Sequence, residues 1–163
     1  MKILQTFDTQ IGLRSIISKS TTVFILTLFI FFNTANLSLA NKGETSRLMR
    51  HAANLSQSGK NEEALKIFLK ITRKEPNNFY AHNNLGMVYS QIQKNDKALN
   101  AYEKSLSINP NFPMTLNNIG SLHMKMGHYD KAEMFLKKAS SLFGSLHLVS
   151  TNLGELYFKQ KLL

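Results

Sequence analysis

Apolar residues in the second half of the chain recur at the three- and four-residue spacing of an amphipathic helix. Leu85, Val88 and Tyr89 follow this spacing, and Ala98 and Tyr102 follow it again a few residues later. The stretch between the two groups contains the polar run QKND. Because residues at this spacing lie on one face of a helix, the pattern predicts two short helices joined by a polar turn.

The helix pair is repeated along the chain with a period of 34 residues. Asn84, Asn118 and Asn152 mark the period, and they open the short phrases NLG, NIG and NLG. A fixed period in the range of about 20 to 50 residues indicates stacked units, since one small unit cannot bury its apolar face without a neighbour. The predicted units are residues 43–76, 77–110 and 111–144, followed by a partial unit at residues 145–163.

Turn residues separate the two helices of each unit. Gly59 and Gly127 stand where the C-terminus of a helix favours a left-handed backbone. Asn61 and Asn95 follow the turns of the first and second units, and we expect their side chains to cap the helices that begin there.

Small residues recur at fixed places and predict close packing inside each pair. A Gly within a helix costs about 1 kcal/mol relative to Ala, yet Gly86, Gly120 and Gly154 occupy one repeat position in the first helix. We expect each Gly to lie against an Ala of the second helix, so that the two backbones approach closely. These alanines are Ala64, Ala98 and Ala132, and the larger core residues expected around them are Leu55, Tyr89, His123 and Tyr157 at one position and Phe68, Tyr102 and Leu136 at another.

This set of positions resembles the tetratricopeptide repeat family. The second unit carries the family's L-G-x-x-Y motif, its Ala, its aromatic residue and its Pro without departure, at Leu85, Gly86, Tyr89, Ala98, Tyr102 and Pro110. The resemblance covers residue 43 to about residue 161, and it implies an all-α fold, a right-handed α-solenoid of about three and a half stacked antiparallel helix pairs. The first unit departs from the pattern at His51 and Ala52, which suits a terminal unit. The partial fourth unit is expected to act as a capping helix.

The resemblance also implies that the first helices line a concave groove that binds a partner. The groove residues expected from their repeat positions are Tyr80, Asn83, Asn84, Met87, Met114, Asn117, Asn118, Ser121 and Asn152. Most are polar and uncharged, and a side-chain amide offers both a donor and an acceptor to the backbone of an extended peptide. The alternative interpretation of the asparagine row is that it belongs to the family consensus and occurs whether or not a peptide binds.

The first 40 residues predict an export signal. Basic residues precede the apolar run Val23–Phe32, and Ser38 and Ala40 form the small-x-small pattern after which a signal peptidase cuts. A membrane-spanning helix needs about 20 apolar residues, and this run is shorter. Two alternatives stay open, an uncleaved anchor formed by residues 21–40 and a mitochondrial type of presequence suggested by the serines of the leader.

Composition narrows the chemistry of the chain. It contains no Cys, which excludes disulfides and thiol-linked lipid anchors, and its net charge of +10 favours anionic surfaces such as lipid headgroups. Export disfavours nucleic acid as the partner. The five histidines lack the spacing of metal ligands, and no Ser/His/Asp set, HExxH helix or phosphate-binding Gly loop is present. We therefore predict neither enzymatic activity nor a metal or cofactor.

The sequence thus predicts an exported scaffold, periplasmic or secreted, that binds an extended segment or a helix of a protein partner in its groove. The alternative is an envelope assembly factor tethered to the membrane by residues 21–40. In that case a basic convex face, including Lys66, Lys70, Arg73 and Lys74, would rest on anionic lipid. Self-association through the terminal helix is a further alternative.

Overall fold

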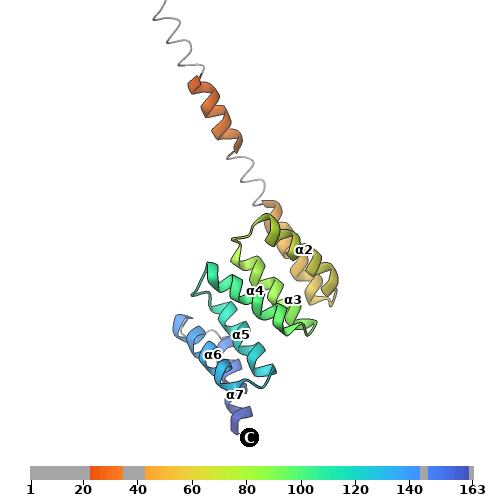
Figure 1. Cartoon of the computed structure of the whole chain (residues 1–163), viewed down its shortest axis with the longest axis vertical. Coiled ribbons are helices and arrows are strands. Elements are labelled where there is room, and N and C mark those ends of the chain that lie inside the picture. The colour runs from red at the N-terminus through yellow and green to blue at the C-terminus, as the bar shows by residue number, and fades with distance from the viewer. Residues whose placement is uncertain (1–22, 35–42, 144–146, 162–163) are drawn as a thin grey trace, which may run out of the picture. The chain divides into compact units, whose positions relative to one another are not determined.

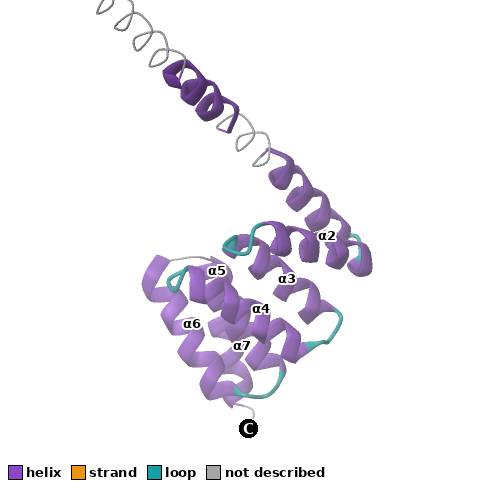
Figure 2. Cartoon of the chain, turned by 45° about the horizontal axis from the view of Figure 1, so that its top comes forward, coloured by secondary structure: helices purple, strands orange, loops and turns teal. Residues whose placement is uncertain are grey.

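Antiparallel helix pairs make up the repeat region, Ser46–Leu163, of this computed structural model (Figure 1). The structure describes residues 23–34, 43–143 and 147–161, and these contain helices and no strands. The repeat region begins within a helix at residues 43–57 and continues with α2 (Asn61–Lys74), α3 (Phe79–Gln91), α4 (Asn95–Ile108), α5 (Pro113–Lys125), α6 (Tyr129–Phe143) and α7 (His147–Lys161). Short loops join the successive helices between residues 57 and 129 (Figure 2). The predicted all-α helical solenoid is confirmed.

Residues 23–34 form a separate helix whose large apolar side chains are exposed, from 51% at Leu28 to 73% at Phe31. No helix in the described ranges has both the length and the apolar character needed to cross a lipid bilayer. The rest of the leader, including Ser38 and Ala40, lies outside the described residues.

A left-handed residue closes the first helix of each of three pairs. Gly59 has φ +79° and Gly127 has φ +78°, as predicted, and Gln93 takes the same place in the middle pair with φ +60°. The next residue then donates its backbone N–H across the helix end, from Lys60 to Leu55 O at 2.9 Å in the first pair. The equivalent bonds of the other two pairs have the same length, 2.9 Å. Identical closures give the pairs a common turn geometry.

The predicted asparagine caps are wrong. Asn61 and Asn95 are the first residues of α2 and α4, and Lys60 and Lys94 hold the cap positions without a side-chain hydrogen bond. An asparagine cap does occur at α3, where the backbone N–H of Ala81 donates to Asn78 Oδ1 at 3.0 Å. α2 and α4 therefore begin one residue earlier than the asparagine pattern suggests.

Each of two internal glycines makes room for a large side chain of the second helix. A Cβ on Gly86 would lie 2.5 Å from Tyr102 Cδ1, and one on Gly120 would lie 2.6 Å from Leu136 Cγ. The sequence predicted an Ala against each Gly, but the Tyr102 ring covers Gly86 and the Leu136 side chain covers Gly120. An alanine contributes as well, because the carbonyl oxygen of Ala132 would lie 3.2 Å from a Cβ on Gly120. Ala98 and Ala132 are completely buried beside these contacts.

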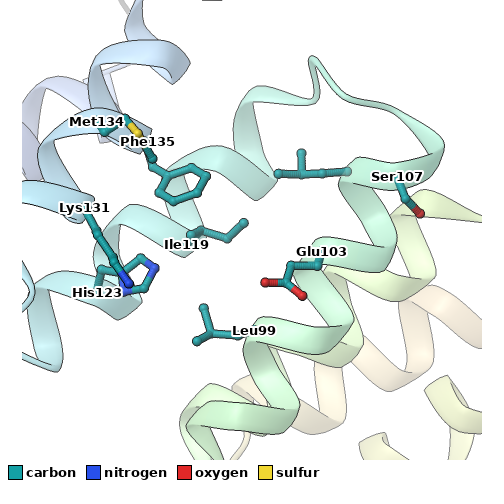
Figure 3. A pocket seen from close by; sticks show the side chains of 9 residues that line it. Leu99, Glu103, Ser107, Ile119, His123, Lys131, Met134 and Phe135 are labelled. Atoms are coloured by element: carbon teal, nitrogen blue, oxygen red, sulfur yellow. The ribbon is translucent and has the colours of Figure 1, made fainter.

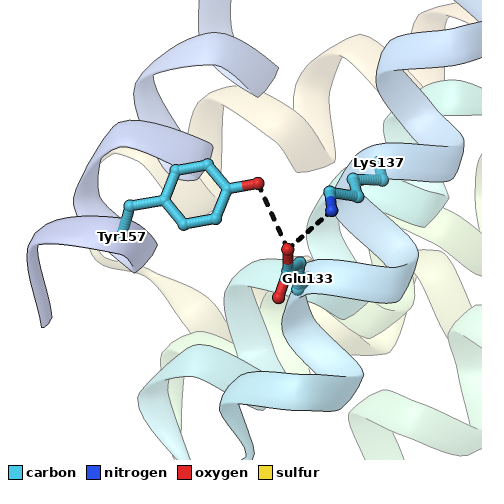
Figure 4. A network of polar contacts seen from close by, with 3 residues as sticks. All are labelled: Glu133, Lys137 and Tyr157. Carbon is cyan, nitrogen blue, oxygen red and sulfur yellow. Dashed lines mark hydrogen bonds and ion pairs between the residues drawn. The ribbon is translucent and has the colours of Figure 1, made fainter. Parts of the chain in front are cut away.

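The terminal helix α7 packs through Val149 and Leu156, which are 1% and 0% exposed. Tyr157, expected in the core, is instead 45% exposed, and a Cβ on Gly154 would meet no heavy atom within 4 Å. The Tyr157 hydroxyl donates to Glu133 Oε1 of α6 at 3.3 Å, and Lys137 Nζ lies 2.7 Å from the same oxygen (Figure 4). Tyr157 therefore forms a polar contact with α6 and does not join the core.

Candidate functional site

The residues predicted to line the groove divide into three classes of exposure. Tyr80, Met87 and Met114 are exposed at 52%, 38% and 46%. The half-buried residues are Asn84, Asn118, Ser121 and Asn152. Asn83 and Asn117 are only 3% and 2% exposed. The surface available to a partner is therefore smaller than the predicted set.

The buried asparagines connect neighbouring units instead of facing a ligand. Asn118 Nδ2 donates to Asn83 Oδ1 at 3.0 Å, and Asn152 Nδ2 donates to Asn117 Oδ1 at 2.8 Å. Each bond joins the first asparagine of one unit, Asn83 or Asn117, to the residue of the next unit that marks the 34-residue period, Asn118 or Asn152. Asn83 and Asn117 consequently differ from the prediction, because their side chains are used inside the stack.

A buried polar network extends the first of these bonds. Thr115 Oγ1 donates to Asn83 Oδ1 at 2.9 Å, and Ser105 Oγ donates to Phe79 O at 2.9 Å. The two hydroxyl oxygens also lie 3.0 Å apart. Since each hydroxyl has one hydrogen, two of these three contacts can be hydrogen bonds at one time. The network fixes how α3, α4 and α5 meet.

Asn84 differs from the other members of its row. The residue that would accept its bond in the preceding unit is Met49, not an asparagine. Asn84 Oδ1 accepts a long contact from Asn83 Nδ2 at 3.4 Å, while its own Nδ2 donates to no other described residue. Asn84 is therefore the member of the row whose amide hydrogens are left for a ligand.

Two small hollows lie along the first helices, and Asn84 lines the smaller of them. One has a volume of about 60 Å³, lies between residues 43–57 and α3, and includes Asn84. The other has a volume of about 170 Å³, lies between α3 and α5, and includes Asn118 and Ser121. Met87 and Gln91 line both hollows. The exposed Met87 side chain thus borders both hollows, and we name the surface that they form together the Met87 groove.

Tyr80 belongs to an aromatic cluster at the other end of α3. Its ring centroid lies 4.1 Å from that of Phe79 and 5.1 Å from that of Phe112, and these two rings are 4.9 Å apart. The contact of Tyr80 with Phe112 is edge-to-face, and such a pair contributes about 0.5 to 1.5 kcal/mol beyond its buried area. Tyr80 is therefore an exposed aromatic side chain that is supported by two neighbouring rings.

A larger pocket of about 610 Å³ lies on the opposite face, between the second helices α4 and α6 (Figure 3). It is lined by Leu99, Glu103, Leu106, Ser107, Ile119, His123, Lys131, Met134 and Phe135. Sequence reasoning placed His123 in the core, and the residue is indeed buried, but the pocket beside it was missed. The available signal was His123 itself, a smaller ring at a position that holds Tyr in the neighbouring units.

The environment of His123 favours the neutral imidazole. The ring is 7% exposed and stacks on Phe135, with centroids 5.8 Å apart and planes at 18°. Burial lowers its pKa, and the positive charges of Lys131 and His128 lower it further, against an opposing effect of Glu103. Its buried Nδ1 has no hydrogen-bond partner within the described part of the chain.

Comparisons with known proteins identify the repeat. Two tetratricopeptide repeat profiles match the sequence, over residues 79–112 and residues 101–134. No curated protein matches the chain. A solved structure from a functional characterization of Pseudomonas aeruginosa pilF is 24% identical, with a TM-score of 0.67 over 72% of this chain and 54% of that one. The first TPR of Spaghetti (RPAP3), solved with the HSP90 peptide SRMEEVD, is 14% identical, with a TM-score of 0.66 over 72% of this chain and 93% of that one.

The chain spans about half the length of the pilF structure that it matches. At these identities the two structures show a common fold and carry no statement about the ligand. The matched profiles, the repeated Gly contacts and the paired helices agree with that fold. Together they show that residues 79–134 form tetratricopeptide repeats.

Proposed function

We propose that this protein is an interaction scaffold that binds an extended segment of a partner protein along the Met87 groove. The observation that carries the proposal is the Nδ2 group of Asn84, which is unpaired among the described residues, lines one hollow and lies next to a second hollow through the shared Met87. An extended peptide presents alternating backbone donors and acceptors that an amide can pair, while its side chains enter neighbouring hollows. The RPAP3 domain, which has the same fold, was solved with a bound peptide.

The groove favours a segment of low charge. Its lining is mostly amide, hydroxyl and thioether groups, with Lys125 at one end of the larger hollow. Met adapts its shape to different apolar side chains, because it is unbranched and polarizable. The positions at which some relatives grip a terminal carboxylate with Lys or Arg hold Met49, Ala53, Met114 and Asn118 here. A segment with one or two apolar side chains fits this surface better than an acidic tail.

A photocrosslinking amino acid in place of Tyr80 tests the proposal in cells. The partner captured there should no longer be captured when Asn84→Ala and Met87→Ala are added, because both the amide and the adaptable contact are removed. Asn100→Ala is the matched control, since Asn100 is an exposed asparagine of α4. Equal capture by the double variant and the control would refute binding in this groove. Circular dichroism should show unchanged helical content in all variants.

We also propose that residues 1–40 export the repeat region across a membrane. The support is the charged leader followed by a helix at residues 23–34 with exposed apolar side chains. N-terminal sequencing of the protein purified from cell fractions distinguishes the alternatives. A soluble product that begins at Asn41 indicates a cleaved signal, and an intact product in the membrane fraction indicates an anchor. An intact product in the cytoplasm would contradict export.

A further inference from the structure

The terminal helix α7 leaves uncovered two positions that the second helix covers in the preceding unit. In α5, Gly120 lies against Leu136 of α6, and Met124 is 4% exposed in the same cluster. One repeat later these two positions hold Gly154 and Phe158. A Cβ on Gly154 would meet no heavy atom within 4 Å, and Phe158 is 66% exposed. Within the described part of the chain, α7 therefore presents an uncovered glycine and an exposed ring.

Gly154 and Phe158 lie on the same face of α7. They are four residues apart, which is about one turn of a helix, whereas the buried residues Val149 and Leu156 lie on the other side. The glycine leaves a recess in the helix surface, and the ring one turn later projects from it. This face of α7 thus contains both halves of a packing contact.

The second unit shows what fits against a glycine at this repeat position. A Cβ on Gly86 would lie 2.5 Å from Cδ1 of the Tyr102 ring, so an aromatic ring already occupies that space. Tyr102 belongs to α4, which is antiparallel to α3 within the pair (Figure 1). The complement of the Gly154 face is therefore an aromatic side chain carried by an antiparallel helix.

The charges near this face favour an antiparallel approach of a second α7. Glu155 Oε1 lies 3.1 Å from Lys159 Nζ on the same helix. On the neighbouring α6, Glu133 Oε1 lies 2.7 Å from Lys137 Nζ (Figure 4). Exposed Lys161 lies at the C-terminal end of the face. An antiparallel approach keeps the two copies of Lys161 at opposite ends of the contact, whereas a parallel approach would bring these like charges together.

We propose that α7 binds α7 of a second copy of this chain in an antiparallel arrangement, in which each Phe158 covers the Gly154 of the other copy. A two-fold symmetric contact requires one face that contains both complementary surfaces, and this face does. The contact is smaller than a standard interface of about 800 Å² per partner, because it involves one helix of each copy. We expect a reversible dimer with a dissociation constant on the order of 10 to 100 μM. The contact does not involve the Met87 groove, and either can fail without the other.

Disulfide crosslinking tests this arrangement, because the chain has no Cys of its own. An antiparallel pair centred between Gly154 and Phe158 places residue 151 of one copy beside residue 161 of the other, and both positions are exposed. Full-length Thr151→Cys and Lys161→Cys, with different tags, are mixed at about 100 μM and oxidised with copper phenanthroline. The mixture should form a dimer with both tags at least about tenfold faster than either variant alone forms a dimer, because like positions lie too far apart to be bridged.

Two further changes connect the crosslink to the proposed contact. Phe158→Glu removes the projecting ring, and Gly154→Leu fills the recess. Either change, made in both tagged proteins, should reduce the mixed dimer to the level of the single variants. Met134→Glu is the matched control, since Met134 is 58% exposed on α6, and it should leave the crosslink unchanged. All three positions are exposed, so thermal melts should show that each variant still folds.

Equal crosslinking in the mixture and in the single variants would overturn the antiparallel arrangement. A crosslink that survives both Phe158→Glu and Gly154→Leu would mean that the copies meet through another segment, such as residues 23–34, and would overturn the contact at Gly154. Absence of any mixed dimer at about 100 μM would overturn self-association through α7.

Discussion

At the scale of single residues, the three helix closures share a left-handed backbone but not a residue type. Gly59 and Gly127 adopt it without a side chain, whereas Gln93 adopts φ +60° with one. A left-handed residue other than Gly carries a cost, because its Cβ approaches the following carbonyl oxygen. The middle closure is therefore the most strained of the three.

Gln93→Gly should raise stability by about 1 kcal/mol, since it removes this strain and leaves the turn unchanged. The measurement is the urea concentration at the midpoint of unfolding of the full chain, compared between proteins whose free energy of unfolding depends on urea with the same slope. Gly127→Ala is the matched opposite change and should lower the midpoint by a similar amount. A loss of stability in Gln93→Gly would show that the Gln side chain has a favourable contact that outweighs the strain.

The two classes of helical glycine predict opposite effects of one substitution. Gly86→Ala should destabilise the protein by about 1 to 3 kcal/mol, because the new methyl would lie 2.5 Å from the Tyr102 ring. Gly154→Ala should stabilise by about 1 kcal/mol, since that position is open and Ala favours a helix. Thermal melts of both variants, followed by circular dichroism, provide the comparison. Melting temperatures that change in the same direction would contradict the packing described for Gly86.

Titration of His123 should make stability fall at acidic pH. Its pKa is lower in the folded protein than the ordinary 6.5, so the unfolded chain takes up a proton first as the pH decreases. The contribution is present above pH 6.5 and is lost as the pH falls from 6.5 towards the folded pKa. Urea midpoints between about pH 8 and about pH 5 should decrease less in His123→Gln than in the parent. Replacement of the exposed His147 by Gln is the control. If the urea midpoint of His123→Gln falls with decreasing pH as steeply as that of the parent, His123 is not the group responsible.

At the scale of helices, the asparagine pairs determine how consecutive units meet. Asn83 accepts hydrogen bonds from both Thr115 and Asn118 of the next unit. These bonds are buried, and a buried polar group that loses its partner destabilises a protein. The asparagine row is thus a structural feature of the stack before it is a ligand contact.

Asn83→Ala should lower the free energy of unfolding by about 1 to 3 kcal/mol, because Asn118 loses its acceptor and Thr115 keeps only the contact with Ser105. A double-mutant cycle with Asn118→Ala should show that the two losses are not additive. Asn54→Ala provides the control at an exposed asparagine of the preceding unit. Additive losses would mean that the 3.0 Å bond makes no net contribution.

The period, the helix pairs and the left-handed glycines could be predicted because they depend on local patterns within one unit. The roles of Asn83 and Asn117 could not be predicted, because each of these buried side chains bonds to a residue of the next unit. Similarly, the repeat position of His123 predicted its burial, but the pocket depends on Phe135 and on the distance between α4 and α6. Partial exposure of Tyr157 reflects the absence of a covering helix in the described region, which repeat spacing does not reveal.

At the scale of the whole repeat region, stability is a sum over units and the contacts between neighbours. The packing of α7 against its neighbours depends on two buried residues, Leu156 with Met124, Ala132 and Leu136, and Val149 with Leu116 and Ala139. Exposed Phe158, at 66%, contributes little to it. We therefore expect this end of the stack to open before the middle.

Leu156→Ala should cost about 2 to 5 kcal/mol locally, because it leaves a cavity in a fully buried cluster. Hydrogen exchange should become faster in α6 and α7 and remain slow in α3. Leu148→Ala, at a 48% exposed position of the same helix, is the control. Uniformly faster exchange throughout the chain would indicate that the repeat region unfolds as one cooperative unit.

The asparagine bonds between units also give the array a direction. Every unit with an Asn pair offers an acceptor to the unit after it and a donor to the unit before it. A copy of residues 79–112 inserted after residue 112 would therefore leave no new amide unmatched. The chain could therefore be lengthened at that point. A copy placed ahead of the unit that contains Met49 would instead add a junction without the bond between amide side chains.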